Sequence, residues 1–165
     1  MDRPAAPRGL TAMKLMDYLS DEQIVMDLKA TTKIEVLKEV ADFAYGKGLI
    51  PDGNALFRGL AEREDLISTG IGGGIAIPHT RYPGPEKLFI ILARSKKGVD
   101  FDALDGEPVF LFIVIAGPES ADKEQLKILS RTARLLKQAE FRDRLLGMET
   151  PADVFGCIQE EEALF

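Results

Sequence analysis

The sequence predicts a single domain of the α/β class, because helical patterns come before, between and after short apolar segments that are typical of buried strands. A chain of 165 residues matches one compact domain, and its 45% hydrophobic share supplies a sizeable core. No internal repeat, low-complexity tract or long linker divides it. We expect residues 1–13 to form an N-terminal tail, since the first nine carry two prolines and two arginines, and residues 14–165 to form the domain.

Two helices are predicted in the first half of the chain, after a short strand at Ile24 and Val25. The run Thr32-Lys33-Ile34-Glu35 is a capping-box pattern that begins the first helix. Its apolar stripe comprises Ile34, Leu37, Val40, Ala41 and Ala44. We expect Gly46 and Gly48 to end this helix.

The second helix is predicted to begin at Asp52. Its apolar face carries Leu56, Phe57 and Leu60, and its far end carries Arg63 and Glu64. The helix therefore brings two charged residues to the start of the segment that follows.

Two continuous apolar runs, 88–93 and 109–116, predict the central strands of the sheet. They are short, rich in β-branched and aromatic residues, and bounded by glycine, proline and charged residues. Because the runs are continuous and do not alternate with polar residues, we expect them to be buried on both faces. Residues 75–77 predict a shorter strand, and Pro118 ends the second central strand.

Helical periodicity returns in the last third of the chain. Residues 122–137 are predicted as a helix whose apolar positions are Leu126, Leu129, Ala133 and Leu136. A short helical piece follows at residues 141–146. A last helix opens at Thr150-Pro151-Ala152-Asp153, where proline occupies the first turn.

Composition excludes several classes of protein. The net charge of −6 argues against a nucleic-acid partner and suits a basic protein partner. With one cysteine and one histidine, neither an internal disulfide nor a metal cluster of Cys and His is available. No apolar run reaches membrane-spanning length, and the residues before Lys14 lack the apolar core of a signal peptide. We therefore expect a cytoplasmic protein without membrane insertion.

The single histidine, His79, lies in the most informative run of the chain, residues 68–81. A lone histidine is usually a surface or structurally satisfied residue, but four of the five residues from Gly70 to Gly74 are glycine. Such a loop suits close approach of the backbone to a ligand or partner. It matches neither the P-loop nor the G-x-G-x-x-G spacing. We expect a flexible loop, a short strand, a rigid corner at Pro78 and then an imidazole that this corner aims.

The residues from Arg63 to His79 read Arg-Glu-Asp-Leu-Ile-Ser-Thr-Gly-Ile-Gly-Gly-Gly-Ile-Ala-Ile-Pro-His. This segment resembles the signature of the fructose/mannitol-type IIA domains of the bacterial phosphoenolpyruvate-dependent phosphotransferase system, including their nitrogen-regulatory branch. The resemblance extends from about Leu15 to Ile158 and includes residues 98–101 and 104–109. It implies a single domain with a mixed β-sheet flanked by helices on both faces.

The resemblance also implies a function. In this family the matching histidine accepts a phosphoryl group from the carrier HPr or its nitrogen-branch counterpart, so His79 would form a phosphohistidine without a cofactor or a metal. We expect a phosphotransferase component in a nitrogen-regulatory-type signalling role, with a regulatory target protein downstream. The alternative is a sugar-transport component that passes phosphate to a IIB domain. A third interpretation is a small-ligand protein that retained only the fold.

Four further residues are predicted to bind phosphate. Arg63 matches the family's arginine, and its guanidinium pairs bidentately with phosphate oxygens. Thr69 and Gly70 offer a hydroxyl and a backbone N–H, although Thr69 equally suits a turn. Gln125 aligns where many transport-type members carry a second histidine; it can donate a hydrogen bond but cannot carry the charge. For Arg81 the better expectation is a surface residue.

Overall fold

The computed structural model describes residues 13–81 and 87–164, so all but the last residue of the predicted tail lies outside the described part. The strands are β1 (Ile24–Val25), β2 (Gly70–Gly72), β3 (Ile75–Ala76), β4 (His79–Arg81), β5 (Phe89–Val99) and β6 (Val109–Gly117). The α-helices are α1 (Lys33–Gly46), α2 (Gly53–Leu66), α3 (Asp122–Leu136), α4 (Ala139–Gly147) and α5 (Pro151–Glu162). Short 3-10 turns are η2 (Leu15–Asp17), η3 (Asp21–Gln23) and η4 (Glu119–Ala121).

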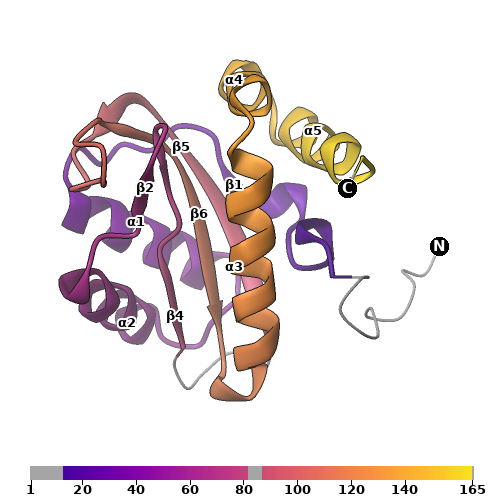
Figure 1. The fold of residues 1–165 in the computed structure, drawn as a ribbon. Coiled ribbons are helices and arrows are strands. Elements are labelled where there is room, and N and C mark those ends of the chain that lie inside the picture. The colour runs from indigo at the N-terminus through magenta and orange to yellow at the C-terminus, as the bar shows by residue number, and fades with distance from the viewer. Residues whose placement is uncertain (1–12, 82–86, 165) are drawn as a thin grey trace.

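The described strands form one mixed sheet of six strands in the order β1-β5-β6-β3-β2, with β4 also paired to β6. The pairs β1–β5, β3–β6 and β4–β6 are parallel, whereas β5–β6 and β2–β3 are antiparallel. One core lies between the sheet and helices α1 and α2, and a second lies between the sheet and helices α3, α4 and α5 (Figure 1). The predicted mixed sheet with helices on both faces is therefore confirmed.

Strands β5 and β6 are buried on both faces, as their continuous apolar runs predict. Successive side chains enter opposite cores: Ile91 and Val114 pack on the α1/α2 side, and Ile90 and Ile115 pack on the α3 side. Strand β5 continues beyond the predicted run to Val99. This extension is more polar, and its last residue, Val99, pairs with Val109 at the start of β6. The next residue of β6, Phe110, donates a backbone hydrogen bond to the Gly74 carbonyl.

The glycine run is a hairpin and not the flexible loop that the sequence suggested. Residues 70–72 pair with β3, and Gly73 and Gly74 form the turn with φ of +67° and +80°. Residues with side chains rarely adopt these angles, so the glycines are needed for the turn. The run therefore adds a strand to the sheet.

The rigid corner expected at Pro78 is also wrong. Ile75 pairs with Leu111 and His79 pairs with Ile115, so β3 and β4 follow β6 in one register on both sides of the proline. The Pro78 carbonyl accepts a hydrogen bond of 3.0 Å from the Ile115 N–H. Proline suits an extended backbone and removes only its own N–H from the ladder, so the chain runs straight on and His79 is aligned by the sheet.

Two predicted helix faces require correction. In α3 the predicted apolar residue Leu126 is 66% exposed, whereas Leu136 is buried and Leu129 and Ala133 pack against the second core, as predicted. The other buried residues of this helix are Gln125, Ile128, Thr132 and Leu135. In α1 Ile34 is 52% exposed and Val36 is buried instead. The capping box at Thr32 and the N-caps at Asp52 and Thr150 are confirmed. Packing against the sheet sets the rotation of each helix, whereas caps depend on local sequence.

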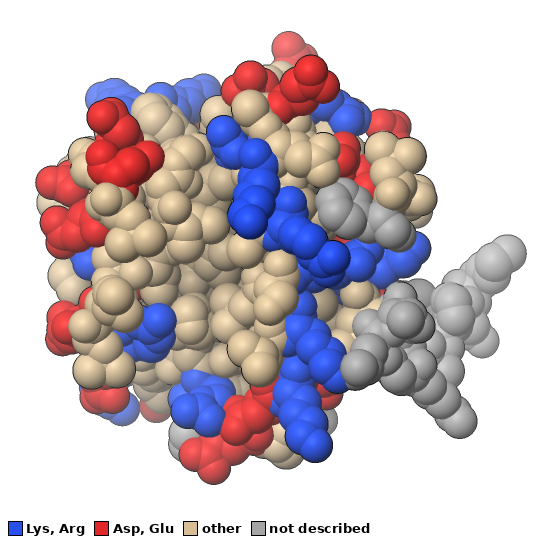
Figure 2. All heavy atoms as spheres, in the orientation of Figure 1, with Lys and Arg blue, Asp and Glu red and all other residues tan. Residues whose placement is uncertain are grey.

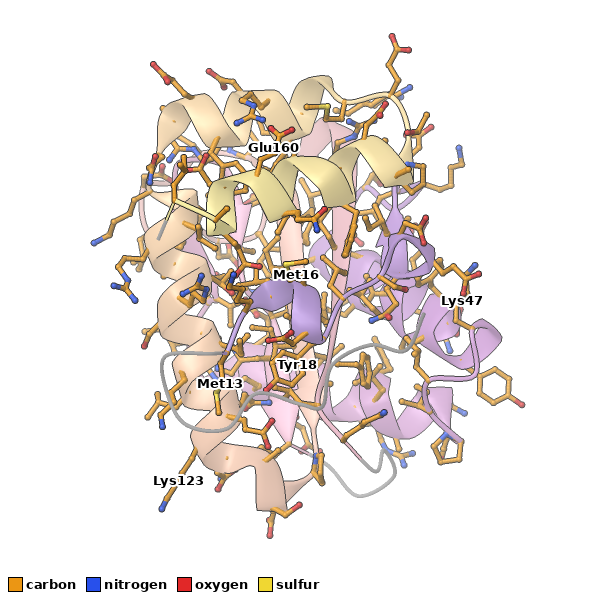
Figure 3. All side chains as sticks on the ribbon, turned by 90° about the vertical axis from the view of Figure 1, so that its right-hand side faces the viewer. Met13, Met16, Tyr18, Lys47, Lys123 and Glu160 are labelled. Carbon is orange, nitrogen blue, oxygen red and sulfur yellow. The ribbon has the colours of Figure 1, made fainter. Side chains whose placement is uncertain are left out.

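The first described residues pack against the C-terminal half of the domain (Figure 3). The fully buried carboxylate of Glu162 accepts hydrogen bonds from the N–H groups of Leu15 and Met16 and pairs with Arg131 at 2.7 Å. The Tyr18 hydroxyl donates to Glu124 in the first turn of α3 at 2.8 Å. These contacts hold α3 and α5 together on the second face of the sheet.

Helix α2 approaches strand β4 very closely. Gly59, in the interior of α2, faces Thr80, and a Cβ built on Gly59 would lie 2.8 Å from the Thr80 hydroxyl oxygen. No side chain larger than hydrogen fits at this distance without movement. The glycine therefore allows the far end of α2 to lie beside His79.

We predict that alanine has different effects on stability at two glycines in helix interiors. Gly59→Ala and Gly156→Ala both gain about 0.5–1 kcal/mol of helix propensity. Nothing lies within 4 Å of a Cβ built on Gly156, so Gly156→Ala should stabilise the protein. Gly59→Ala should be less stable than Gly156→Ala by about 1–3 kcal/mol, because Thr80 must move. Urea unfolding of both variants measures this difference, and equal stabilisation would contradict the contact.

Candidate functional site

His79 lies in an open depression of about 660 Å³ between α2, β4 and α3. Its lining comprises Gly59, Glu62, Arg63, Leu66, His79, Thr80, Arg81, Asp122, Gln125, Leu126 and Leu129. Figure 2 shows this face as a largely uncharged hollow, bordered by a line of basic side chains over α3. Three of the five residues predicted to act in the site, His79, Arg63 and Gln125, are therefore brought together.

The imidazole of His79 is held in one tautomer. Its Nδ1 lies 2.7 Å from the Ile77 carbonyl oxygen. Because a carbonyl only accepts hydrogen bonds, Nδ1 carries the proton and Nε2 keeps its lone pair in the neutral ring. Burial is the main cause that lowers the pKa of His79, and the hydrogen bond to the Ile77 carbonyl is the main effect that opposes it. The positive charge of Arg63 lowers the pKa further by a smaller amount, and Glu64 has the smallest opposing effect. The ring is therefore neutral at pH 7, with Nε2 able to act as a nucleophile.

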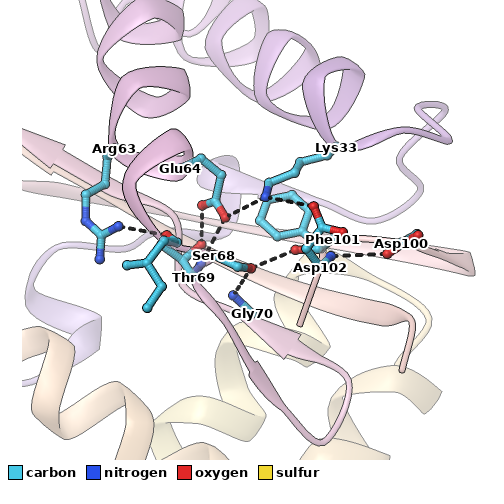
Figure 4. Close-up of polar contacts among 10 residues, drawn as sticks. Lys33, Arg63, Glu64, Ser68, Thr69, Gly70, Asp100, Phe101 and Asp102 are labelled. Atoms are coloured by element: carbon cyan, nitrogen blue, oxygen red, sulfur yellow. Dashed lines mark hydrogen bonds and ion pairs between the residues drawn. The ribbon is translucent and has the colours of Figure 1, made fainter. Parts of the chain in front are cut away.

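Arg63 lies at the last turn of α2 and contributes to the lining of the same depression. One of its N–H groups donates to the Ile67 carbonyl at 2.9 Å, which anchors the guanidinium on the segment that follows the helix (Figure 4). A guanidinium has five N–H groups, so donors remain for an anion in the depression.

A buried carboxylate behind Arg63 supports this arrangement. Glu64 accepts hydrogen bonds from the Thr69 N–H at 2.8 Å and from the Thr69 hydroxyl, and it pairs with Lys33 at 3.2 Å (Figure 4). Its side chain is only 3% exposed. A buried carboxylate needs such partners, and together they fix the segment between α2 and β2. This link holds the Ile67 carbonyl that anchors Arg63.

The role of Glu64 was missed by sequence reasoning, although a signal was present. Glu64 follows Leu56 and Leu60 at intervals of four residues, and both leucines are fully buried. Four-residue spacing places all three on one helix face. A charged residue on that face indicates a buried ion pair or hydrogen-bonded carboxylate.

Thr69 and Gly70 lie outside the lining of the depression. The Thr69 hydroxyl donates to Glu64, and the Gly70 N–H donates to the Ser68 hydroxyl oxygen at 3.0 Å. Both polar groups therefore have partners within the loop, in the way expected of turn residues. Their proposed contacts with phosphate stay predictions.

Gln125 reaches the site from α3 and is buried. Its side-chain N–H donates to the Thr80 carbonyl at 3.0 Å, so it holds the residue that follows His79. Arg81 is an exposed rim residue that pairs with Asp122 at 2.8 Å. The apolar wall of Leu66, Leu126 and Leu129 was not foreseen, because the last two were assigned to the core.

Among the described residues, no three His, Cys, Asp or Glu side chains are grouped in a way that would hold a metal ion. Within the same part of the chain, every helix is too short or too polar to span a lipid bilayer. The lining of the depression offers the imidazole of His79, the guanidinium groups of Arg63 and Arg81, the carboxylates of Glu62 and Asp122, and the amide of Gln125.

Comparison with known proteins identifies the family of the chain. Residues 17–161 match the family described as the phosphoenolpyruvate-dependent sugar phosphotransferase system, EIIA 2. The chain is 37% identical over 146 residues to a nitrogen regulatory protein of Bradyrhizobium diazoefficiens, which covers 88% of this chain and 95% of that protein. It is 34% identical over 150 residues to the fructose-specific EIIABC component of Bacillus subtilis, covering 91% of this chain but 24% of that protein.

Among solved structures, the nitrogen regulatory protein IIA-Ntr of Neisseria meningitidis superimposes with a TM-score of 0.81 at 31% identity. The match covers 86% of this chain and 97% of that one. Sequence and fold thus agree over most of the chain, and the chain belongs to the EIIA 2 family of the phosphoenolpyruvate-dependent sugar phosphotransferase system.

Proposed function

We propose that the protein is a phosphocarrier that accepts a phosphoryl group from an HPr-type carrier on His79. The observation that carries this proposal is the contact between Nδ1 of His79 and the Ile77 carbonyl, which leaves Nε2 unprotonated in an open depression beside Arg63. Transfer between two proteins needs an exposed acceptor, and a shallow depression allows a second protein to approach in line.

In the proposed step, the Nε2 lone pair of His79 attacks the phosphorus of the carrier's phosphohistidine. The carrier's P–N bond breaks, and its electron pair returns to the carrier's imidazole, which leaves neutral when its other nitrogen is protonated. His79 then holds a phosphoryl group on Nε2 and a proton on Nδ1. The Ile77 carbonyl accepts a hydrogen bond from this proton and so favours the positively charged ring.

Arg63 supplies the positive charge for the moving phosphoryl oxygens. Phosphoryl transfer involves little covalent chemistry for the protein, so positioning and charge stabilisation dominate. The anchor on Ile67 leaves the guanidinium at the depression with donors to spare. In the folded protein this cation also adds to the larger effect of burial in lowering the pKa of His79 before transfer.

We propose a regulatory role of the nitrogen-regulatory type. Gln125 supports it, because the amide is engaged with the Thr80 carbonyl and adds no charge, so stabilisation of the phosphoryl group depends on Arg63. A phosphoryl group of about −1.5 to −2 charge is sufficient to switch a protein contact. In this role the downstream partner is a regulatory target protein.

The alternative is a sugar-transport component, which the 34% identity to a fructose-specific EIIABC component favours. In that role the phosphoryl group passes on to a IIB domain. The two roles differ in the step after His79. Rapid transfer to a IIB protein supports transport, whereas a phosphorylation-dependent change in affinity for a target supports regulation.

Incubation with phosphoenolpyruvate, enzyme I and HPr should add one phosphoryl group to the protein, read by intact mass. The adduct should be acid-labile and alkali-stable, because a phosphoramidate hydrolyses in acid and a phosphoester does not. His79→Ala should remove it completely, since no other imidazole exists in the chain. An acid-stable adduct, or one retained in His79→Ala, would exclude the proposal.

Arg63→Ala should slow phosphoryl uptake by about 10- to 100-fold. The reason is the loss of a charge-assisted pair of about 1.5–3 kcal/mol, at about 1.4 kcal/mol per tenfold in rate. Arg63→Lys should restore part of the rate, because it keeps the charge without the fork. The matched control is Arg58→Ala, an exposed arginine on the same helix outside the depression. Equal rates of phosphoryl uptake in Arg63→Ala and Arg58→Ala would show that Arg63 is a surface residue without a role in the transfer.

The pKa of His79 should lie below its ordinary value of 6.5, because burial and Arg63 both disfavour the protonated ring. The neutral nucleophile, and with it phosphoryl uptake, should therefore persist at pH values where a free imidazole is protonated. Arg63→Ala should raise this pKa part of the way, since burial remains. NMR titration of the imidazole measures both values without ambiguity of assignment, and a pKa at or above 6.5 in the parent protein would contradict the site.

A further inference from the structure

The outward side of α3 carries a straight line of cations. Lys127, Arg134 and Lys137 follow Lys123 by 4, 11 and 14 residues. At about 100° per residue these four positions fall within roughly 80° of one helix face, along about 21 Å of its axis. Figure 2 shows basic side chains in a line over α3, and Figure 3 shows Lys123 pointing away from the domain. We call these four residues the α3 cationic face.

Within residues 13–81 and 87–164, the α3 cationic face has no ion pair. Some exposed cations elsewhere have carboxylate partners, such as Lys38 with Asp42 and Arg144 with Glu160. On α3 itself, Arg131 turns to the buried Glu162 and is therefore not counted in the face. A chain of net charge −6 has carboxylates to spare, so a line of unpaired cations is a local concentration of charge against the overall sign.

An apolar strip runs beside these cations. Leu126 lies on the flank of the face, is 66% exposed, and forms part of the wall of the His79 depression together with Leu129. A surface that combines cations with an exposed leucine offers both charge attraction and apolar burial to a partner. It is continuous with the depression, because Gln125 and Leu126 belong to its lining.

We propose that the α3 cationic face, with Leu126, docks an acidic surface of a partner protein. Carboxylates of the partner would pair with the four cations, and an apolar side chain would cover Leu126. A long nucleic acid extends past the α3 cationic face, so the net charge of −6 on the whole chain repels it. A small acidic patch on a protein interacts mainly with the cations nearby, because salt screens the more distant charges. A protein partner is therefore favoured over nucleic acid. The proposal concerns the unmodified protein and does not depend on phosphorylation of His79.

The test uses a fluorescein-labelled oligo-glutamate peptide that carries one leucine. The peptide should bind at low salt, bind more weakly as salt is added, and perturb backbone NMR signals of α3. The double variant Lys127→Glu, Lys137→Glu should weaken binding about tenfold, because attraction becomes repulsion at two positions. The control Lys29→Glu, Lys47→Glu changes the net charge equally at exposed positions outside α3 and should bind as the parent does.

Urea unfolding tests whether both double variants fold. His79→Ala should bind the peptide as tightly as the parent protein does. Because this variant cannot accept a phosphoryl group, its binding tests the docking proposal independently of the proposed phosphoryl transfer. Equal loss in both double variants, or NMR changes that leave residues 122–137 unaffected, would overturn the proposal. Tighter binding to duplex DNA or to phosphatidylserine vesicles than to the peptide would also overturn it, in favour of those partners.

Discussion

The parallel pairing of β3 and β4 with β6 is the interaction on which the site depends. Strand β6 is buried on both faces and pairs along both edges, so its position is determined by both cores at once. Because β3 and β4 keep one register with β6 across Pro78, the backbone at His79 is set by the ladder. The same stretch places the Ile77 carbonyl against Nδ1. A reactive imidazole thus takes its orientation and its tautomer from a sheet.

Helices α2 and α3, on opposite faces of the sheet, both contact strand β4 at Thr80. Gly59 of α2 faces the Thr80 side chain, and Gln125 of α3 donates a hydrogen bond to the Thr80 carbonyl. The depression is lined by residues of α2, β4 and α3, so its walls come from segments distant in sequence. Arg63 reaches it because α2 lies so close, and the Glu64–Thr69 contact holds the following segment in place. Rigid support of this kind is what group transfer between proteins requires.

The charged residues around His79 differ from those along the neighbouring α3 cationic face. The charged residues that line the depression around His79 are Glu62, Arg63, Arg81 and Asp122. Arg81 pairs with Asp122, and Arg63 is the cation that lowers the pKa of the His79 ring. The α3 cationic face has no ion pair among the described residues, in a chain that is acidic overall. Leu126 joins the two areas. A partner seated on α3 would therefore touch the edge of the site at which the charge of His79 changes.

The sequence by itself predicted the helices, the two central buried strands and the helix caps, and it named His79, Arg63 and Gln125 as candidate site residues, which the fold brings to one depression. These depend on local rules: continuous apolar runs for two-sided burial, Thr32 and Asp52 for caps, and a family motif around the histidine. Only the tertiary structure decided which way α3 is rotated, because packing on the sheet selected Gln125 and Ile128 and left Leu126 outside. It also decided that the glycine run is a hairpin and that Pro78 makes no corner, since both follow from strand pairing over long sequence distances. The Lys33–Glu64–Thr69 link belongs to the same class, because its partners come from three separate segments that only the folded chain brings together.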